Sequence, residues 1–141
     1  MAFVRTISCA VALLLVADIS RALDQYCPKE ITTRQAIENA PPGWTAASDK
    51  TPQILAGITF FDGPPEQEAS LVYDSYTKSK TVDVALWRFD RSAHIWLSCS
   101  YHATAVKLSK PLPAQTTECR VTYSREVHID GNGEIESIRC K

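Results

Sequence analysis

Three histidines, His94, His102 and His128, are the residues of this sequence best suited to acid–base chemistry, because imidazole changes its charge near neutral pH. A Ser-His-acid hydrolase requires a serine, a histidine and a carboxylate in mutual contact. Ser100 and His102 offer the first two groups, but they lie two residues apart on one face of an expected strand, and no nucleophile-elbow motif surrounds the serine. A Ser100–His102 hydrolase is therefore the third of three functional hypotheses, and no catalytic residue is assigned.

Oxygen-bearing side chains alternate along Asp130–Glu136, as they do in a calcium-binding loop. Ile135 occupies the sixth position, however, where an EF-hand requires glycine. Gly131-Asn132-Gly133 instead supplies the positive-φ positions of a tight hairpin turn. The sequence therefore predicts a β-hairpin in this segment, with no metal and no cofactor.

The segment Asp62–Glu68 is a loop by composition and the main candidate for binding. It has an acidic rim and two adjacent prolines, formed by Asp62, Glu66, Glu68, Pro64 and Pro65. Prolines stiffen a loop, so less conformational entropy is lost when it docks. We expect a protruding loop that enters a cationic cleft on a partner; the alternative is a solvated connection between two strands.

Three tryptophans, Trp44, Trp87 and Trp96, could line a sugar-binding face. Trp87 is interpreted as a core residue. Trp96 shares its strand face with the small polar residues Ser98 and Ser100, which leaves room for a ligand beside the indole. Trp96 is therefore the candidate residue for binding a small molecule or a glycan.

The N-terminal 22 residues have the pattern of a secretory signal peptide. Arg5 precedes a short apolar run, Ile7–Val16, and Ser20-Arg21-Ala22 supplies small residues for cleavage after Ala22. The run is too short to span a membrane, and no later segment reaches the roughly 20 apolar residues that a span needs. The product, residues 23–141, is expected to be one periplasmic or secreted domain. The full sequence has a formal net charge of −1, and the loss of Arg5, Arg21 and Asp18 makes the product slightly more negative, so there is no basic field for nucleic acid or anionic lipid.

Four cysteines remain after cleavage: Cys27, Cys99, Cys119 and Cys140. An even number in a small exported domain predicts two disulfides. The wide spacings contain no Cys-x-x-Cys pair, which argues against zinc. Three pairings are possible; we expect Cys99–Cys119 between two strands and Cys27–Cys140 between the two ends of the chain.

The elements that position these residues are short strands separated by turns. The central one is a hairpin over residues 93–110, because apolar residues alternate along its first strand with one buried face: Ile95, Leu97, Cys99 and Tyr101. Further strands are expected at 54–61, 69–74, 82–89, 117–123, 127–130 and 134–140, with weaker signals at 31–37 and 44–47 and a polar turn at 76–80. In the strand at 54–61, Ile54 and Phe60 share the expected inner face. This pattern predicts an all-β, single-domain antiparallel β-sandwich or open barrel stapled by two disulfides.

Several of these segments together resemble a family of small exported bacterial proteins of unknown function. The resemblance spans most of residues 23–141 and is carried by the segments Gly57–Pro65, Ala69–Asp74, Trp96–Tyr101, Leu108–Pro113 and Cys119–Tyr123. It implies a bacterial origin and a periplasmic or extracellular location. It brings no established activity and no catalytic residues.

Small size, export, two bridges and a stiff acidic loop favour a non-enzymatic binding protein. Its expected form is an inhibitor or immunity protein that acts on a cell-wall hydrolase or a toxin. The alternative is a small-molecule or glycan-binding module that uses the Trp96 face.

Overall fold

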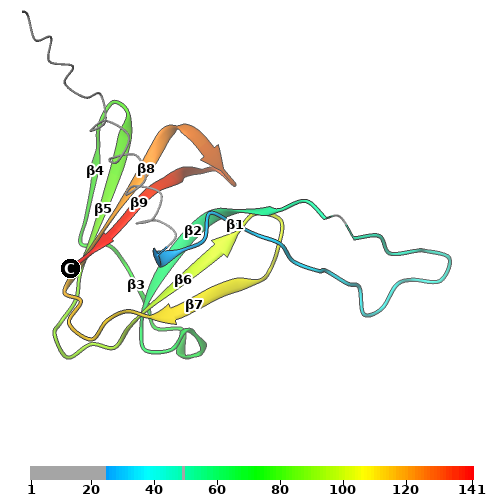
Figure 1. The fold of residues 1–141 in the computed structure, drawn as a ribbon, viewed down its shortest axis with the longest axis horizontal. Coiled ribbons are helices and arrows are strands. Elements are labelled where there is room, and N and C mark those ends of the chain that lie inside the picture. Colours follow the sequence, from blue (N-terminus) through cyan, green and yellow to red (C-terminus); the bar gives the residue numbers. More distant parts are fainter. Residues whose placement is uncertain (1–24, 49) are drawn as a thin grey trace, which may run out of the picture.

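The protein is a sandwich of two antiparallel β-sheets, as the computed structural model shows for residues 25–48 and 50–141 (Figure 1). The expected signal peptide, residues 1–22, lies outside the described residues. The first sheet contains β1 (Glu30–Ile31), β2 (Gln53–Asp62), β3 (Ser70–Leu71), β6 (Ile95–Tyr101) and β7 (Lys107–Pro111). The second contains β4 (Ser75–Lys78), β5 (Val82–Arg88), β8 (Glu118–Ile129) and β9 (Asn132–Cys140). The all-β prediction is confirmed, and the fold is an open sandwich rather than a closed barrel.

The order of the strands in each sheet follows from their backbone pairing. The first sheet runs β1-β2-β6-β7, with β3 also paired to β2, and the second runs β4-β5-β8-β9. The predicted hairpin at residues 93–110 is confirmed as β6 and β7, with Cys99 opposite Leu108. The predicted inner face of β6 is also confirmed, because each of its four members is at most 4% exposed: Ile95, Leu97, Cys99 and Tyr101.

Aromatic side chains join the two sheets. Phe60 of β2 is fully buried, and its ring centroid lies 5.0 Å from that of Trp87 on β5 and 5.5 Å from that of Phe89. The Trp87 indole N–H donates to the carbonyl of Leu71 at 3.3 Å. Trp87 therefore packs in the core, as predicted from the sequence.

A β-bulge changes the phase of β2, and it corrects the expected faces of that strand. The pairing of β2 with β6 shifts between Leu55 and Gly57. As a result Leu55 is buried at 4% exposure whereas Ile54 is 48% exposed, although Phe60 remains in the core. A bulge adds one residue to one strand, so the alternation of inward and outward side chains reverses on its two sides.

The number of disulfides is as predicted, but the expected pairing is wrong. The bridges are Cys27–Cys99 and Cys119–Cys140. Cys119 and Cys140 lie directly opposite each other on β8 and β9, with their Cα atoms 4.1 Å apart. Cys27 packs against the inner face of β6, where it is fully buried. The Cys119–Cys140 bridge therefore joins two paired strands of one sheet, whereas Cys27–Cys99 ties the segment before β1 to β6. Neither bridge joins the two ends of the chain.

Three weaker expectations are also wrong. Residues 76–80 were expected to form a turn, but β4 occupies most of them and pairs with β5. The strand expected at 31–37 ends at Ile31, and residues 44–47 form no strand. The predicted hairpin near Gly131 is confirmed, but its positive-φ residues are Asp130 and Gly131. Asn132 and Gly133, which were also expected to supply positive φ, are the first residues of β9.

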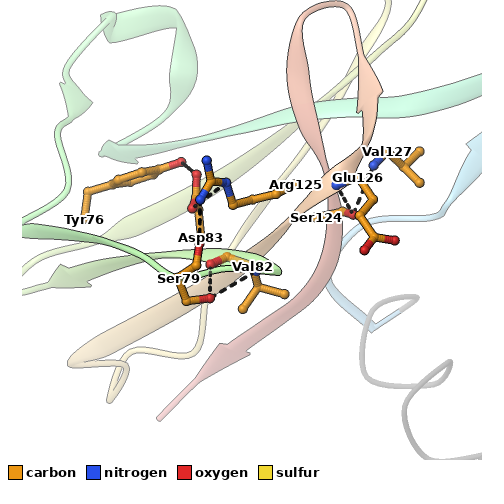
Figure 2. A network of polar contacts seen from close by, with 8 residues as sticks. All are labelled: Tyr76, Ser79, Val82, Asp83, Ser124, Arg125, Glu126 and Val127. Atoms are coloured by element: carbon orange, nitrogen blue, oxygen red, sulfur yellow. Dashed lines mark hydrogen bonds and ion pairs between the residues drawn. The ribbon is translucent and has the colours of Figure 1, made fainter.

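Polar contacts link β4, β5 and β8 of the second sheet near the β4–β5 turn (Figure 2). Asp83 on β5 accepts a hydrogen bond from the Tyr76 hydroxyl at 2.9 Å and forms an ion pair with Arg125 at 3.7 Å. On β8 the Ser124 hydroxyl accepts hydrogen bonds from the amides of Glu126 and Val127, each at 3.2 Å. This serine satisfies backbone donors where the pairing of β8 with β9 is interrupted.

Tyr123, which lies beside this network, is expected to make the stability of the protein decrease at alkaline pH. Burial, together with the nearby Tyr76, raises the pKa of Tyr123 from its ordinary value of 10.0 to about 12. Between these pH values the unfolded chain loses the phenolic proton and the folded chain keeps it. The stabilising contribution of the Tyr123 phenol is therefore complete below pH 10. Between pH 10 and about pH 12 we expect this group to lower the free energy of unfolding by about 1.4 kcal/mol per pH unit.

Urea unfolding at a series of pH values measures this slope. Tyr123→Phe should flatten it, while Tyr73→Phe, at a tyrosine that is 46% exposed, should leave it in place. An unchanged slope in the Tyr123 variant would contradict the assignment.

Candidate functional site

The face of the first sheet that points away from the second sheet carries two cross-strand rows. The strand registers align Phe61, Trp96 and Pro111 in one row and Thr59, Ser98 and Ser109 in the next. The intervening residues, among them Phe60 and Leu97, point into the core. Alternation along each strand thus leaves an apolar row beside a hydroxyl row on the outer face.

The Asp62–Glu68 loop adjoins this face, and its backbone has a fixed conformation. The amide of Gly63 donates to the carbonyl of His94 at 2.9 Å, and that of Asp62 donates to the carbonyl of Ala69 at 2.9 Å. Residues Pro65–Gln67 form a 3-10 turn, η1, and the amide of Glu68 donates to the carbonyl of Pro65 at 3.0 Å. The loop is therefore held at both ends and turned on itself in the middle.

The loop and the outer face line one groove with a volume of about 560 Å³. The loop contributes two carboxylates and one proline to it, and the strands contribute the rest; the lining residues are Pro65, Glu66, Glu68, Phe61, Ser70, Ser98, Lys107 and Ser109. Ser109 donates a hydrogen bond to the hydroxyl of Ser98 at 2.9 Å. The groove thus combines carboxylates, one ammonium group and hydroxyls.

The structure brings the two binding candidates from the sequence to one end of the sheet. Trp96 lies opposite Phe61, which directly precedes Asp62 at the start of the loop. Trp96 is partly buried, whereas the three acidic residues of the loop are exposed. Sequence reasoning missed Lys107 and Ser109, because only the register between β6 and β7 places them beside the loop.

His102, one of the histidine candidates, contacts a carboxylate but forms no catalytic triad among the described residues. His102 Nδ1 lies 2.5 Å from the carboxylate of Asp130, and both side chains are about half exposed, at 55% and 46%. Ser100 makes no hydrogen bond to His102 among those of residues 25–48 and 50–141. Instead, Ser100 helps to line a cavity of about 370 Å³ with Tyr76 and Tyr123. The arrangement lacks the serine–histidine contact that nucleophilic catalysis requires.

Two further properties can be stated for the part of the chain that the structure describes. It brings no three His, Cys, Asp or Glu side chains into a cluster that could hold a metal ion. Nor does it contain a helix with the length and hydropathy needed to cross a membrane.

The fold and the candidate site together define a disulfide-bonded β-sandwich with a structured acidic loop beside a mixed apolar and hydroxyl face. Comparison with known families gives this class a more definite identity. Residues 49–141 match the family described as type VI secretion system Tli immunity proteins, and the chain belongs to that family.

A curated relative is similarly small and bacterial. The chain is 28% identical over 142 residues to an uncharacterised 16.3 kDa protein in the trpG 5' region of Azospirillum brasilense, covering 92% of this chain and 94% of the relative. No solved structure matches the chain. The resemblance to small bacterial proteins of unknown function therefore agrees in part with these findings, and the family match adds the immunity class.

Proposed function

We propose that this protein is a periplasmic immunity protein that binds and neutralises a toxin delivered by a type VI secretion system. The observation that carries the proposal is the family match over residues 49–141, which includes the whole groove and the acidic loop. Two disulfides suit an oxidising compartment. The signal peptide expected at residues 1–22 would deliver the chain to the periplasm. On this proposal the protein acts by occupying its target, without chemistry of its own.

The groove and the Asp62–Glu68 loop form the proposed toxin-binding surface. The loop presents three exposed carboxylates, and complementary charge on a partner speeds encounter and selects the right partner. Its backbone hydrogen bonds and prolines fix the conformation before binding, so that little entropy is lost on docking. The adjacent Trp96 offers the type of side chain that dominates binding energy at interfaces.

Growth of a sensitive bacterium tests the proposed function. Each type VI effector of the source bacterium is directed to the periplasm of the test strain, alone and together with the full chain. We expect one effector to stop growth alone and the full chain to restore it, because the bound effector is inactive.

A variant that lacks residues 1–22 provides the matched control for location. It should fail to protect, because it stays in the cytoplasm while the toxin acts outside. If no effector is suppressed and none forms a complex with the purified chain, the immunity function is wrong.

A further inference from the structure

A long arm leaves the first sheet between β1 and β2; its described residues are 32–48 and 50–52. β1 and β2 are antiparallel neighbours, with Glu30 opposite Ile54. The chain therefore departs from the sheet and returns to the same place, and Figure 1 shows the arm projecting away from both sheets. Connections of this length without secondary structure are uncommon in compact domains and are usually functional or disordered.

The root of the arm is attached to the sheet by side-chain hydrogen bonds. Gln53 is only 6% exposed; its oxygen accepts from the amide of Thr33 at 2.9 Å, and its nitrogen donates to the carbonyl of Thr51 at 2.6 Å. The Gln35 side chain donates to the carbonyl of Ala103, at the β6–β7 turn, at 3.0 Å. Both limbs of the arm are thus tied to the body, which sets the direction in which the arm points.

The tip of the arm, residues 39–48, is uncharged and exposed, and the exposed Glu38 directly precedes it. Trp44 is 76% exposed and Ile37 is 62% exposed, and the turn between them closes with a hydrogen bond from the Trp44 amide to the carbonyl of Pro41 at 3.1 Å. Residues 39–48 contain no charged side chain. Gly43 has a φ of 84°, a conformation that glycine adopts without strain. The fold therefore presents a large indole on a proline-stiffened turn, where the body of the protein does not cover it.

We propose that the arm is a second toxin-contacting surface, in which Trp44 enters an uncharged, apolar pocket of the same toxin that the groove binds. This inference rests on the proposed function. Tryptophan is enriched among the residues that carry most of the energy of protein interfaces. A preorganised turn loses little conformational entropy when it inserts into a pocket. Because the tip carries no charge, a charged cleft would offer it no favourable ion pair, and an uncharged pocket suits it better.

The composition of the arm favours a protein pocket over a lipid surface. Segments that lie in a membrane interface combine several apolar side chains with lysines or arginines on an amphipathic helix. The arm has one tryptophan, no helix, and its cations only near the root, at Arg34 and Lys50. Residues 32–48 also precede the segment matched by the family, so the arm provides a contact beyond the shared part of the fold.

The arm and the acidic loop adjoin opposite ends of β2, which begins at Gln53 and ends at Asp62. At a rise of about 3.3 Å per residue these ends lie roughly 30 Å apart. The two contacts are therefore separate, and a substitution in one leaves the other unchanged. This separation allows each to be tested alone.

Isothermal titration calorimetry tests the arm. The probe is the effector whose toxicity the full chain suppresses, titrated with the wild-type chain, Trp44→Ala and the exposed control Val127→Ala. Truncating a tryptophan hot spot should weaken the affinity about 30-fold, while the control binds as the wild type does. The thermal midpoints of all three should agree, because Trp44 packs on nothing in the core.

The outcomes separate this inference from the function on which it rests. If the wild-type chain binds no effector, both are wrong. If it binds and Trp44→Ala has wild-type affinity, the arm is not a toxin contact, although the immunity function stands. Vesicles of phosphatidylethanolamine and phosphatidylglycerol provide the remaining comparison: Trp44-dependent vesicle binding with unchanged toxin affinity would identify a membrane contact and overturn the inference.

Discussion

Removing the Cys27–Cys99 disulfide is expected to lower the free energy of unfolding by about 4 kcal/mol, against about 3 kcal/mol for Cys119–Cys140. The two bridges differ in the length of chain that they close, with sequence separations of 72 and 21 residues. A longer closed loop restricts the unfolded chain more strongly, so its bridge contributes more to stability. The short bridge also joins two strands that their own ladder already pairs.

The Cys27–Cys99 bridge has a second structural role, because it fixes the residues that precede β1. Cys27 is fully buried, and the Tyr101 hydroxyl donates to the carbonyl of Pro28 at 3.1 Å. Lys110 donates to the carbonyl of Gln25. Without the disulfide these contacts must hold the segment alone, so we expect β1 and the root of the arm to loosen before the rest of the sheet.

Urea unfolding of two alanine-pair variants measures the difference. Cys27→Ala with Cys99→Ala should have the lower midpoint, and Cys119→Ala with Cys140→Ala is its matched control. Amide hydrogen exchange should show early exposure of residues 29–31 in the first pair only. Equal losses in the two pairs, or a larger loss in the control, would contradict this account.

The strands could be predicted where alternation is strong and one face is buried. The β6–β7 hairpin followed from the alternating residues of its first strand, which all face the core: Ile95, Leu97, Cys99 and Tyr101. Alternation failed at residues 32–37 and 44–47, which belong to the arm and have no neighbouring strand. Alternating side chains indicate that a segment is compatible with a β-strand. A strand forms, however, only when a second strand pairs with it through backbone hydrogen bonds. A single sequence does not show which segments pair.

The pairing of Cys119 with Cys140 could not be predicted, because it depends on a register shift between β8 and β9. Counting back from Ile129 opposite Asn132 at the hairpin turn would place Val121 opposite Cys140. The irregular pairing between Thr122 and His128 shifts the register, so that Cys119 lies there instead. Such bulges follow from local backbone hydrogen bonding, here with the hydroxyl of Ser124, and leave little trace in the pattern of apolar residues.

The candidate site was predictable in parts and not as a whole. The loop was visible from its prolines and acids, and the outward direction of Trp96 followed from alternation. Their proximity depends on the register that sets Phe61 opposite Trp96, which joins residues far apart in the chain. Lys107, on the far side of the groove, required the register of β7 as well.

Replacing Asp62, Glu66 and Glu68 together with alanine is expected to weaken toxin binding about 100-fold, which would abolish protection in cells. The three carboxylates are exposed on a loop that backbone hydrogen bonds hold, so the fold should persist with an unchanged thermal midpoint. Much of the loss should appear in the association rate and should shrink at high salt, because exposed charges steer encounter and are screened by ions.

Two further variants make this test specific. Asp62→Asn with Glu66→Gln and Glu68→Gln removes the charge and keeps the shape of the loop, so it should lose nearly as much affinity as the alanine variant. Alanine at Asp90, Glu126 and Glu136 changes the net charge equally at exposed positions elsewhere and should bind as the wild type does. If the loop variant keeps wild-type affinity, the loop is a solvated connection. Loss of binding in Trp96→Ala alone would then place the contact on the outer face of β6.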